Sequence, residues 1–134
     1  MIRTIATAIL LVALLALPAV AQSSLAGTNW RFIEVAGAPV GIPTQISFGN
    51  DGNVSGNSGC NSFHGRYGGD GSGLAFSNMG WTKMLCPDAP TMSVETAIQS
   101  ALAGTRSFTI VERTLHILGA DGAILARLET AAPN

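Results

Sequence analysis

Glycine is the residue that most constrains the fold of this chain, because it interrupts the sequence at short intervals from residue 27 onward. Ten of the 16 glycines lie between Gly49 and Gly80, interleaved with asparagine, serine and aspartate. Glycine adopts positive φ angles without steric cost, and asparagine and aspartate tolerate them, so this composition is typical of tight turns. The segments of regular structure between these turns must therefore be short.

Short segments with β-strand character lie between the turns. They predict strands at residues 30–35, 45–48, 53–56, 63–67, 74–77, 80–84, 107–111, 115–118 and 124–128. Residues 49–52 and 119–122 separate neighbouring segments, and short connections rich in Gly with Asn or Asp are typical of β-hairpins. In the second hairpin Leu115 and Ile117 flank His116, which predicts one apolar and one polar face. The spacing indicates an antiparallel meander.

One segment, residues 92–103, departs from the β pattern and predicts a helix. Its apolar residues fall on one helical stripe, formed by Val94, Ile98, Ala101 and Leu102. Pro90 precedes the segment, and Gly104 follows it at the position where a C′ glycine commonly ends a helix. No Ser or Thr at its start is followed by Glu or Gln three residues later, so no capping box is predicted.

These elements predict a mainly β fold with one α-helix. Antiparallel strands with one apolar face must pack that face against another layer, and one short helix is too small to cover so many strands. The sheet is therefore expected to curl on itself into a small antiparallel β-barrel-like domain, which the helix plugs or covers. A sandwich of two sheets is the competing architecture.

The first 21 residues form a segment of a different kind. A short basic start is followed by an almost wholly apolar run of thirteen residues, 5–17, then by Pro18 and the small-residue pattern Ala19, Val20, Ala21. This order is typical of a signal peptide cleaved after Ala21, and the apolar run is shorter than the roughly 17–25 residues of a membrane-spanning helix. We expect a signal peptide at 1–21 and a single domain at 22–134, with its core at about 25–129. The protein is then expected in the periplasm or outside the cell. The alternative is that the apolar segment is retained as a membrane anchor.

Composition narrows the classes of partner. The formal net charge is −1 and charged residues make up 11% of the chain, so no basic surface for nucleic acid is expected. Hydrophobic residues make up 47%, which suffices for a core and argues against disorder. We expect a monomer with no nucleic-acid partner and, after signal cleavage, no stable membrane anchor.

The two cysteines, Cys60 and Cys86, are expected to form a disulfide, because an even number of cysteines in an exported chain favours one. Two buried thiols are the alternative, and a redox-active pair lacks the C-x-x-C spacing. A zinc site would need both cysteines to meet His64 and His116, whose spacings fit no usual ligand pattern. A nucleophile pair of Cys60 with His64 has no orienting residue that the sequence reveals. No metal, cofactor or catalytic residue is therefore predicted.

Several other side chains have both a structural and a functional interpretation. Trp30 and Trp81 lie in apolar strands and are expected to anchor the core. Alternatively, Trp81 lines the mouth of a ligand site together with Met79 and Met84. Glu95 is expected to interact with the dipole of the predicted helix, since no second carboxylate is placed to work with it in acid–base catalysis.

Fourteen residues spread between positions 30 and 95 form a recognisable pattern. Those that carry it are Trp30, Gly56, Gly59, Cys60, Asn61, Phe63, Gly65, Tyr67, Thr82, Met84, Cys86, Pro87, Met92 and Glu95. The pattern resembles the META domain of the HslJ family of bacterial heat-shock-related and exported proteins, over roughly residues 25–129. The resemblance implies a barrel-like domain with one helix. Within it, Trp30, Gly59, Asn61, Thr82, Met84 and Glu95 form a structural signature beside the two cysteines.

The resemblance also shapes what we expect the protein to do. Family members are linked to heat shock, to novobiocin tolerance and, in relatives, to virulence or motility, without an established catalytic site. We expect a non-enzymatic envelope protein that acts in heat or envelope stress or in antibiotic tolerance, through contacts with an envelope protein or a small hydrophobic ligand. The alternatives are a β-barrel carrier of a small hydrophobic ligand, a hydrolase or redox enzyme, and an inhibitor or protein-interaction module.

Overall fold

The computed structural model describes residues 11–15 and 25–132. The expected cleavage site after Ala21, and all of the expected signal segment other than residues 11–15, lie outside the described residues. Among the described residues, no helix is both long enough and apolar enough to cross a membrane.

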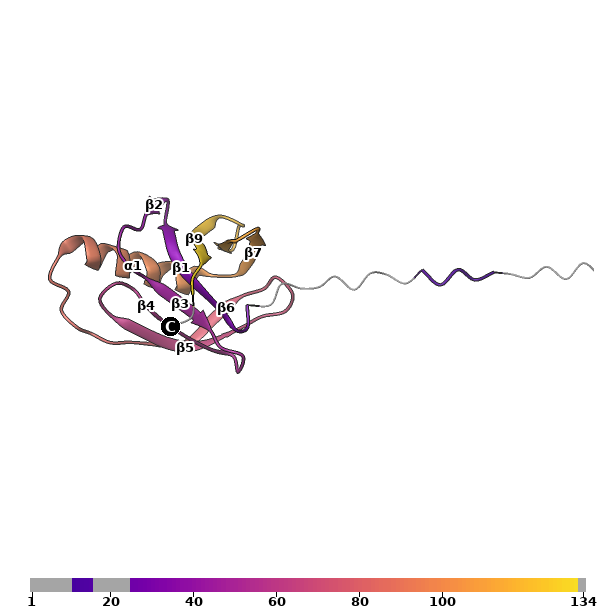
Figure 1. Ribbon diagram of the computed structural model, residues 1–134, viewed down its shortest axis with the longest axis horizontal. Coiled ribbons are helices and arrows are strands. Elements are labelled where there is room, and N and C mark those ends of the chain that lie inside the picture. Colours follow the sequence, from indigo (N-terminus) through magenta and orange to yellow (C-terminus); the bar gives the residue numbers. More distant parts are fainter. Residues whose placement is uncertain (1–10, 16–24, 133–134) are drawn as a thin grey trace, which may run out of the picture.

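The described part of the chain folds into nine strands and one helix (Figure 1). The strands are β1 (Thr28–Val35), β2 (Ala38–Pro39), β3 (Gln45–Phe48), β4 (Asn53–Asn57), β5 (Ser62–Gly68), β6 (Ala75–Trp81), β7 (Ser107–Val111), β8 (Thr114–Leu118) and β9 (Ile124–Thr130), and the helix is α1 (Ala89–Gly104). The predicted class, mainly β with one α-helix, is confirmed.

All strands belong to one antiparallel sheet, ordered β6-β5-β4-β3-β1-β9-β8-β7, with β2 paired to β1. The sheet curls until its two edges approach, where Gly73 bridges Ser107 and the Leu74 N–H donates to the Arg106 carbonyl at 3.0 Å. The result is a half-barrel. This single curled sheet confirms the barrel-like prediction and contradicts the competing two-sheet sandwich.

The hydrophobic core fills the inside of the curl, where α1 packs against β1, β6 and β9. Its most buried large side chains are Phe32, Ile46, Phe48, Val54, Phe63, Ile98, Leu115, Ile117 and Leu128. The alternation predicted for the last hairpin is confirmed, because Leu115 and Ile117 are fully buried and His116 between them is only partly so. Burial of these apolar side chains stabilises the domain, at roughly 25 cal/mol per Å² of apolar surface removed from water.

Both predicted hairpin turns are present. In the first, the Gly49 N–H donates to the Asn53 carbonyl at 2.8 Å, and the Asp51 carboxylate accepts from the Asn53 backbone at 3.1 Å and side chain at 2.7 Å. These hydrogen bonds to Asn53 hold the pKa of Asp51 below its ordinary value. In the second, the Gly119 N–H donates to the Ala123 carbonyl at 2.8 Å. Side-chain oxygens that bind nearby backbone N–H groups explain why Asp suits such turns.

The helix differs from its prediction at both ends. It begins at Ala89 rather than at residue 92, because Asp88 caps it: the Asp88 carboxylate accepts from the Thr91 N–H at 3.3 Å and from the Thr91 hydroxyl at 2.9 Å. A search for Ser or Thr misses an aspartate N-cap, which is equally favoured. Gly104 is the last helical residue rather than the C′ glycine, and the extended Thr105 ends the helix.

Two predicted strands, residues 74–77 and 80–84, are a single strand, β6, and the short β2 was not predicted. The register of β6 against β5 shifts between His64 and Arg66, so Asn78 and Met79 both face Gly65 in a β-bulge. Asn78 has a φ of 51° there. A bulge inserts one extra residue, which interrupts the period-two pattern on which strand prediction depends.

Candidate functional site

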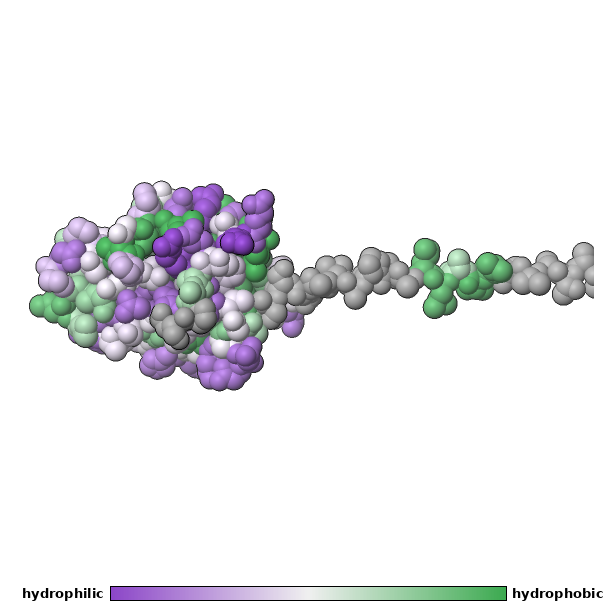
Figure 2. Space-filling model, viewed as in Figure 1, coloured by the Kyte–Doolittle hydropathy of each residue, from purple (hydrophilic) through white to green (hydrophobic). Residues whose placement is uncertain are grey.

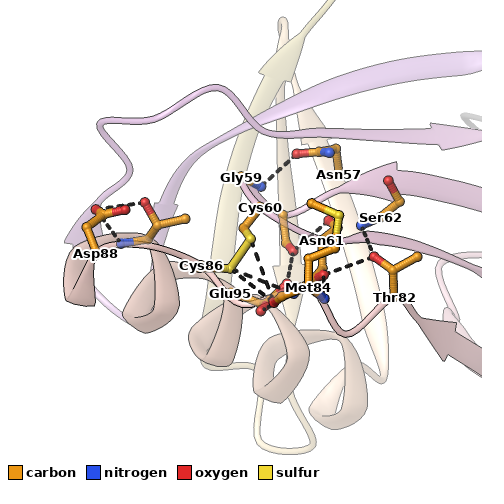
Figure 3. Close-up of a disulfide and its surroundings, with 12 residues drawn as sticks. Asn57, Gly59, Cys60, Asn61, Ser62, Thr82, Met84, Cys86, Asp88 and Glu95 are labelled. Atoms are coloured by element: carbon orange, nitrogen blue, oxygen red, sulfur yellow. Dashed lines mark hydrogen bonds between the residues drawn. A yellow bond between two sulfur atoms is a disulfide. The ribbon is translucent and has the colours of Figure 1, made fainter.

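The disulfide between Cys60 and Cys86 is present, as predicted (Figure 3). It joins residues separated by 26 positions whose Cα atoms lie 5.8 Å apart. Cys60 lies in the loop between β4 and β5, and Cys86 lies in the segment between β6 and α1. Because both sulfurs are bonded, the alternatives that need a free thiol (two buried thiols, a zinc ligand, a nucleophile beside His64) do not apply to this oxidised protein.

Asn61, beside Cys60, uses both ends of its amide to bind the segment that follows β6. Its Oδ1 accepts from the Met84 N–H at 2.6 Å and from the Thr82 hydroxyl at 3.0 Å. Its Nδ2 donates to the Met84 carbonyl at 3.3 Å and to Glu95 Oε2 of α1 at 2.9 Å. Asn61 is only 3% exposed, so these contacts replace water for a buried polar group.

Glu95 is the buried carboxylate at the centre of this arrangement, 4% exposed. Its Oε1 accepts from the Ser58 hydroxyl at 2.8 Å, and the same hydroxyl lies 3.0 Å from the Asn61 carbonyl oxygen. Glu95 is the seventh residue of α1 rather than part of its first turn, because the helix begins earlier than predicted. The sequence had indicated an interaction between Glu95 and the helix dipole. In the structure its carboxylate accepts hydrogen bonds from Ser58 and Asn61 instead.

We call Ser58, Cys60, Asn61, Thr82, Cys86 and Glu95 the signature cluster. Together these residues fasten the β4–β5 loop to α1 and to the segment that precedes it (Figure 3). Gly59 belongs to the same loop, with a φ of 106°, and a side chain there would overlap Ile42. The cluster explains why cysteine, asparagine and glutamate occur at these positions as one connected set.

Trp30, which belongs to the predicted structural signature, and the two histidines lie outside the signature cluster. Trp30 is 3% exposed in β1, where its indole N–H donates to the Thr28 hydroxyl at 2.8 Å, which fits the predicted core anchor. His64 is exposed on β5 and His116 lies on β8. Within residues 11–15 and 25–132, no three His, Cys, Asp or Glu side chains are grouped so that they could hold a metal ion.

The Ser58–Glu95 pair has the chemistry of a nucleophile and a base, but not the access that catalysis requires. Ser58 is 0% exposed, so no substrate reaches its hydroxyl in this conformation. A general base acts only on a proton that lies within hydrogen-bond reach of a bound substrate. The pair therefore serves the contact between loop and helix.

The predicted ligand mouth divides between two clefts. Trp81 and Met84 line one of them, of about 390 Å³, together with Leu85 and Met92; we call it the Met84 cleft. Met79 does not line that cleft but a second one, of about 380 Å³, between β6 and α1. Trp81 lines both clefts, and its ring packs 4.7 Å from that of Phe63.

A third hollow was not predicted. This α1–β9 groove, of about 610 Å³, lies between the outward face of α1 and the start of β9, with Met92, Ala97, Ile124 and Leu125 among its lining residues. No single segment of the sequence predicts this groove, because its two walls are separated by more than twenty residues and meet only in the fold. The sequence held one indirect sign of exposed apolar surface on this helix: Met92 is apolar but lies off the predicted apolar stripe.

Exposed apolar side chains gather where α1 begins. Leu85 is 94% exposed, Met84 is 61% exposed and Met92 is 40% exposed. Figure 2 shows hydrophobic surface at this end of the domain. We call these three residues the methionine patch.

Comparison with known proteins agrees with this geometry. The chain matches the family model of the META domain over residues 23–132. Its fold is similar to the NMR structure of a protein from Burkholderia xenovorans, with 22% identity and a TM-score of 0.64 over 81% of this chain and 85% of that one. It is also similar to the crystal structure of a duf4847 family protein from Bacteroides vulgatus, with 15% identity and a TM-score of 0.56 over 80% and 93% of the two chains.

No curated protein matches the chain. The solved structures share its fold, and at these identities the likeness extends to the fold alone. The family model, in contrast, covers the whole half-barrel together with the signature cluster. This chain belongs to the META domain family.

Proposed function

We propose that this protein is an exported, non-enzymatic protein of the HslJ type, which works in the periplasm or outside the cell under heat, envelope or antibiotic stress. It binds apolar segments of partly unfolded envelope proteins, as a monomer and without a cofactor. The observation that carries the proposal is the methionine patch, Met84, Leu85 and Met92, which leaves large apolar side chains in water.

The chemistry of the patch suits varied partners. Methionine is unbranched and polarizable, so it adapts to irregular apolar surfaces and is frequent where one protein binds many others. Met92 lines both the Met84 cleft and the α1–β9 groove, so apolar surface continues from the patch to both sides of α1. An unfolded segment would find a continuous contact area there rather than an enclosed pocket.

Two further observations support the proposal. The apolar segment at residues 5–17 has the length and flanks of a signal peptide, and disulfides such as Cys60–Cys86 form and persist in oxidising compartments. The non-enzymatic part is supported by the Ser58 hydroxyl, which is 0% exposed, and by the two cysteines, which are bonded to each other and offer no free thiol.

A carrier of a small hydrophobic ligand is the second candidate, favoured by the α1–β9 groove. Its volume of about 610 Å³ falls within the roughly 300–1,000 Å³ of small-molecule sites. The inside of the half-barrel is filled by side chains such as Phe48 and Phe63, each less than 3% exposed. A ligand would therefore bind outside the sheet, against α1.

An aggregation assay tests the first proposal. We expect the purified domain to suppress aggregation of a heat-denatured model enzyme, and the variant M84S/L85S/M92S to lose most of this effect, because it removes the exposed apolar contacts. Val111→Ser is the matched control, since Val111 is 57% exposed but lies on β7, away from the patch. This control should suppress aggregation as well as the natural protein does.

Two results would contradict the proposal: no suppression by the natural protein, or equal suppression by the triple variant. Saturable binding of a hydrophobic dye, displaced by a hydrophobic antibiotic and abolished by Leu125→Lys in the α1–β9 groove, would instead favour the carrier.

A further inference from the structure

The half-barrel is open along the outer edge of β6. The edges of the sheet are β6 and β7, and within the described residues β6 pairs with β5 alone. Among the described residues, the gap between the two edges is bridged by main-chain hydrogen bonds beside the start of β6, where the Phe108 N–H of β7 donates to the Ser72 carbonyl at 2.9 Å. Residues 72–74 thus already hydrogen-bond with β7 and Arg106 across part of the gap between the two sheet edges.

A cleft of about 380 Å³ follows the open part of this edge, between β6 and α1. From β6 it is lined by four consecutive residues, 76–79, and by Trp81; from α1 it is lined by Gln99, Leu102 and Ala103. Phe76 and Ser77 pair regularly with β5 before the bulge, so their side chains point to opposite faces of the sheet. A cleft lined by both of them therefore runs along the edge of the strand rather than over one face.

The main chain of Trp81 faces this cleft. The Thr82 N–H donates to the Ser62 carbonyl of β5 at 3.0 Å. Groups that point toward a given neighbour alternate along an antiparallel strand, so the N–H and C=O of Trp81 point away from β5. They are directed toward the open edge.

The same reasoning applies beyond the bulge. The Tyr67 N–H of β5 donates to the Gly52 carbonyl at 3.0 Å, on the side of β4, so Tyr67 does not hydrogen-bond to β6. Its register partner in β6 is Phe76. The N–H and C=O of Phe76 therefore also point away from β5, toward the cleft.

We infer that the open edge of β6 binds an extended, uncharged polypeptide segment, which adds as a strand along this edge, in the cleft beside α1. The main-chain groups of Phe76 and Trp81 supply its hydrogen bonds, as in other cases where a peptide extends a sheet. The side chains that line the cleft include no charged residue, so the side chains of the segment that enter it are uncharged as well. This inference is independent of the methionine patch and of the proposed role in stress.

The bulge limits what can bind. Asn78 and Met79 interrupt the regular pleat in the middle of β6, and bulges at sheet edges hinder continuous pairing between copies of a protein. The added strand is therefore short, and the edge is protected from open-ended self-association. The occupant that fits is a short peptide, which hydrogen-bonds to β6 at Phe76 and at Trp81, on either side of the bulge.

Titration of the ¹⁵N-labelled full domain with a short peptide of alternating valine and serine tests this inference. We expect saturable shifts of the Phe76 and Trp81 amide signals and slower hydrogen exchange at both, because their N–H groups become hydrogen-bonded. Ala103→Arg, which places a long charged side chain in the cleft, should weaken binding at least about tenfold. Ala123→Arg, on the exposed β8–β9 turn, should bind as the natural protein does.

A peptide in which proline replaces alternate residues lacks the N–H groups of a strand and should not bind. The inference is overturned if the proline peptide binds equally well, if Ala103→Arg leaves the affinity unchanged, or if no shifts occur at Phe76 and Trp81. Concentration-dependent pairing of two domains through β6, without peptide binding, would also overturn it. M84S/L85S/M92S should keep its peptide affinity, which separates this site from the methionine patch.

Discussion

Replacing Cys60 and Cys86 by alanine is expected to lower the free energy of unfolding by about 3–4 kcal/mol. In the chain-entropy model the loss grows with the length of the closed loop, and this disulfide spans 26 positions. A domain of this size should then unfold roughly 10–20 °C lower. Urea unfolding of C60A/C86A beside the oxidised natural protein measures the difference.

A reducing agent provides the control for this prediction. It should lower the stability of the natural protein by a similar amount and leave C60A/C86A unchanged, because that variant has no disulfide to lose. If reduction does not shift the unfolding midpoint of the natural protein, the disulfide does not contribute to stability as the loop length indicates.

Replacing Glu95 by alanine is expected to cost about 3 kcal/mol or more of unfolding free energy. The change removes two hydrogen bonds to a buried carboxylate, from Ser58 at 2.8 Å and from Asn61 at 2.9 Å. Hydrogen bonds to charged groups contribute roughly 1.5–3 kcal/mol each, and the truncation also leaves a cavity. Thermal and urea unfolding measure the loss.

Glu95→Gln is the matched control, and it should change stability by less than about 1 kcal/mol. The glutamine oxygen accepts from the Asn61 amide, and its NH₂ group donates to the Ser58 oxygen. The Ser58 hydroxyl then turns to the Asn61 carbonyl oxygen, which already lies 3.0 Å away. Every buried polar group of the signature cluster keeps a partner. A loss in Glu95→Gln as large as in Glu95→Ala would show that the negative charge itself, rather than the hydrogen-bond pattern, is required.

Local sequence chemistry was enough to predict the turns and several strands. Residues 45–48 and 107–111 coincide with β3 and β7, and both four-residue turns occur where glycine and aspartate indicated them. The disulfide followed from cysteine number together with the expected export. In each case the determinant is a property of a few neighbouring residues, or of a residue type, and needs no knowledge of tertiary contacts.

Features that depend on distant contacts were missed. Glu95 is separated from its partners Ser58 and Asn61 by 37 and 34 positions. Its position within the predicted helix indicated an interaction with the helix dipole and could not reveal these distant partners. The bulge at Asn78 made one strand resemble two, because it breaks the alternation of side chains. The clefts along α1 exist only where strands and helix meet, and no single segment encodes them.

We expect the disulfide and Glu95 to stabilise the same contact, the one between the β4–β5 loop and α1 with the segment that precedes it. A double-mutant cycle tests this most directly. Unfolding free energies are measured for the natural protein, C60A/C86A, E95A and the combined variant, with a stabilising osmolyte present so that all four fold. Once one link is lost the loop moves, so the combined loss should be smaller than the sum of the separate losses by about 1 kcal/mol or more. Losses that add to within about 0.5 kcal/mol would contradict a shared role and leave two independent fastenings.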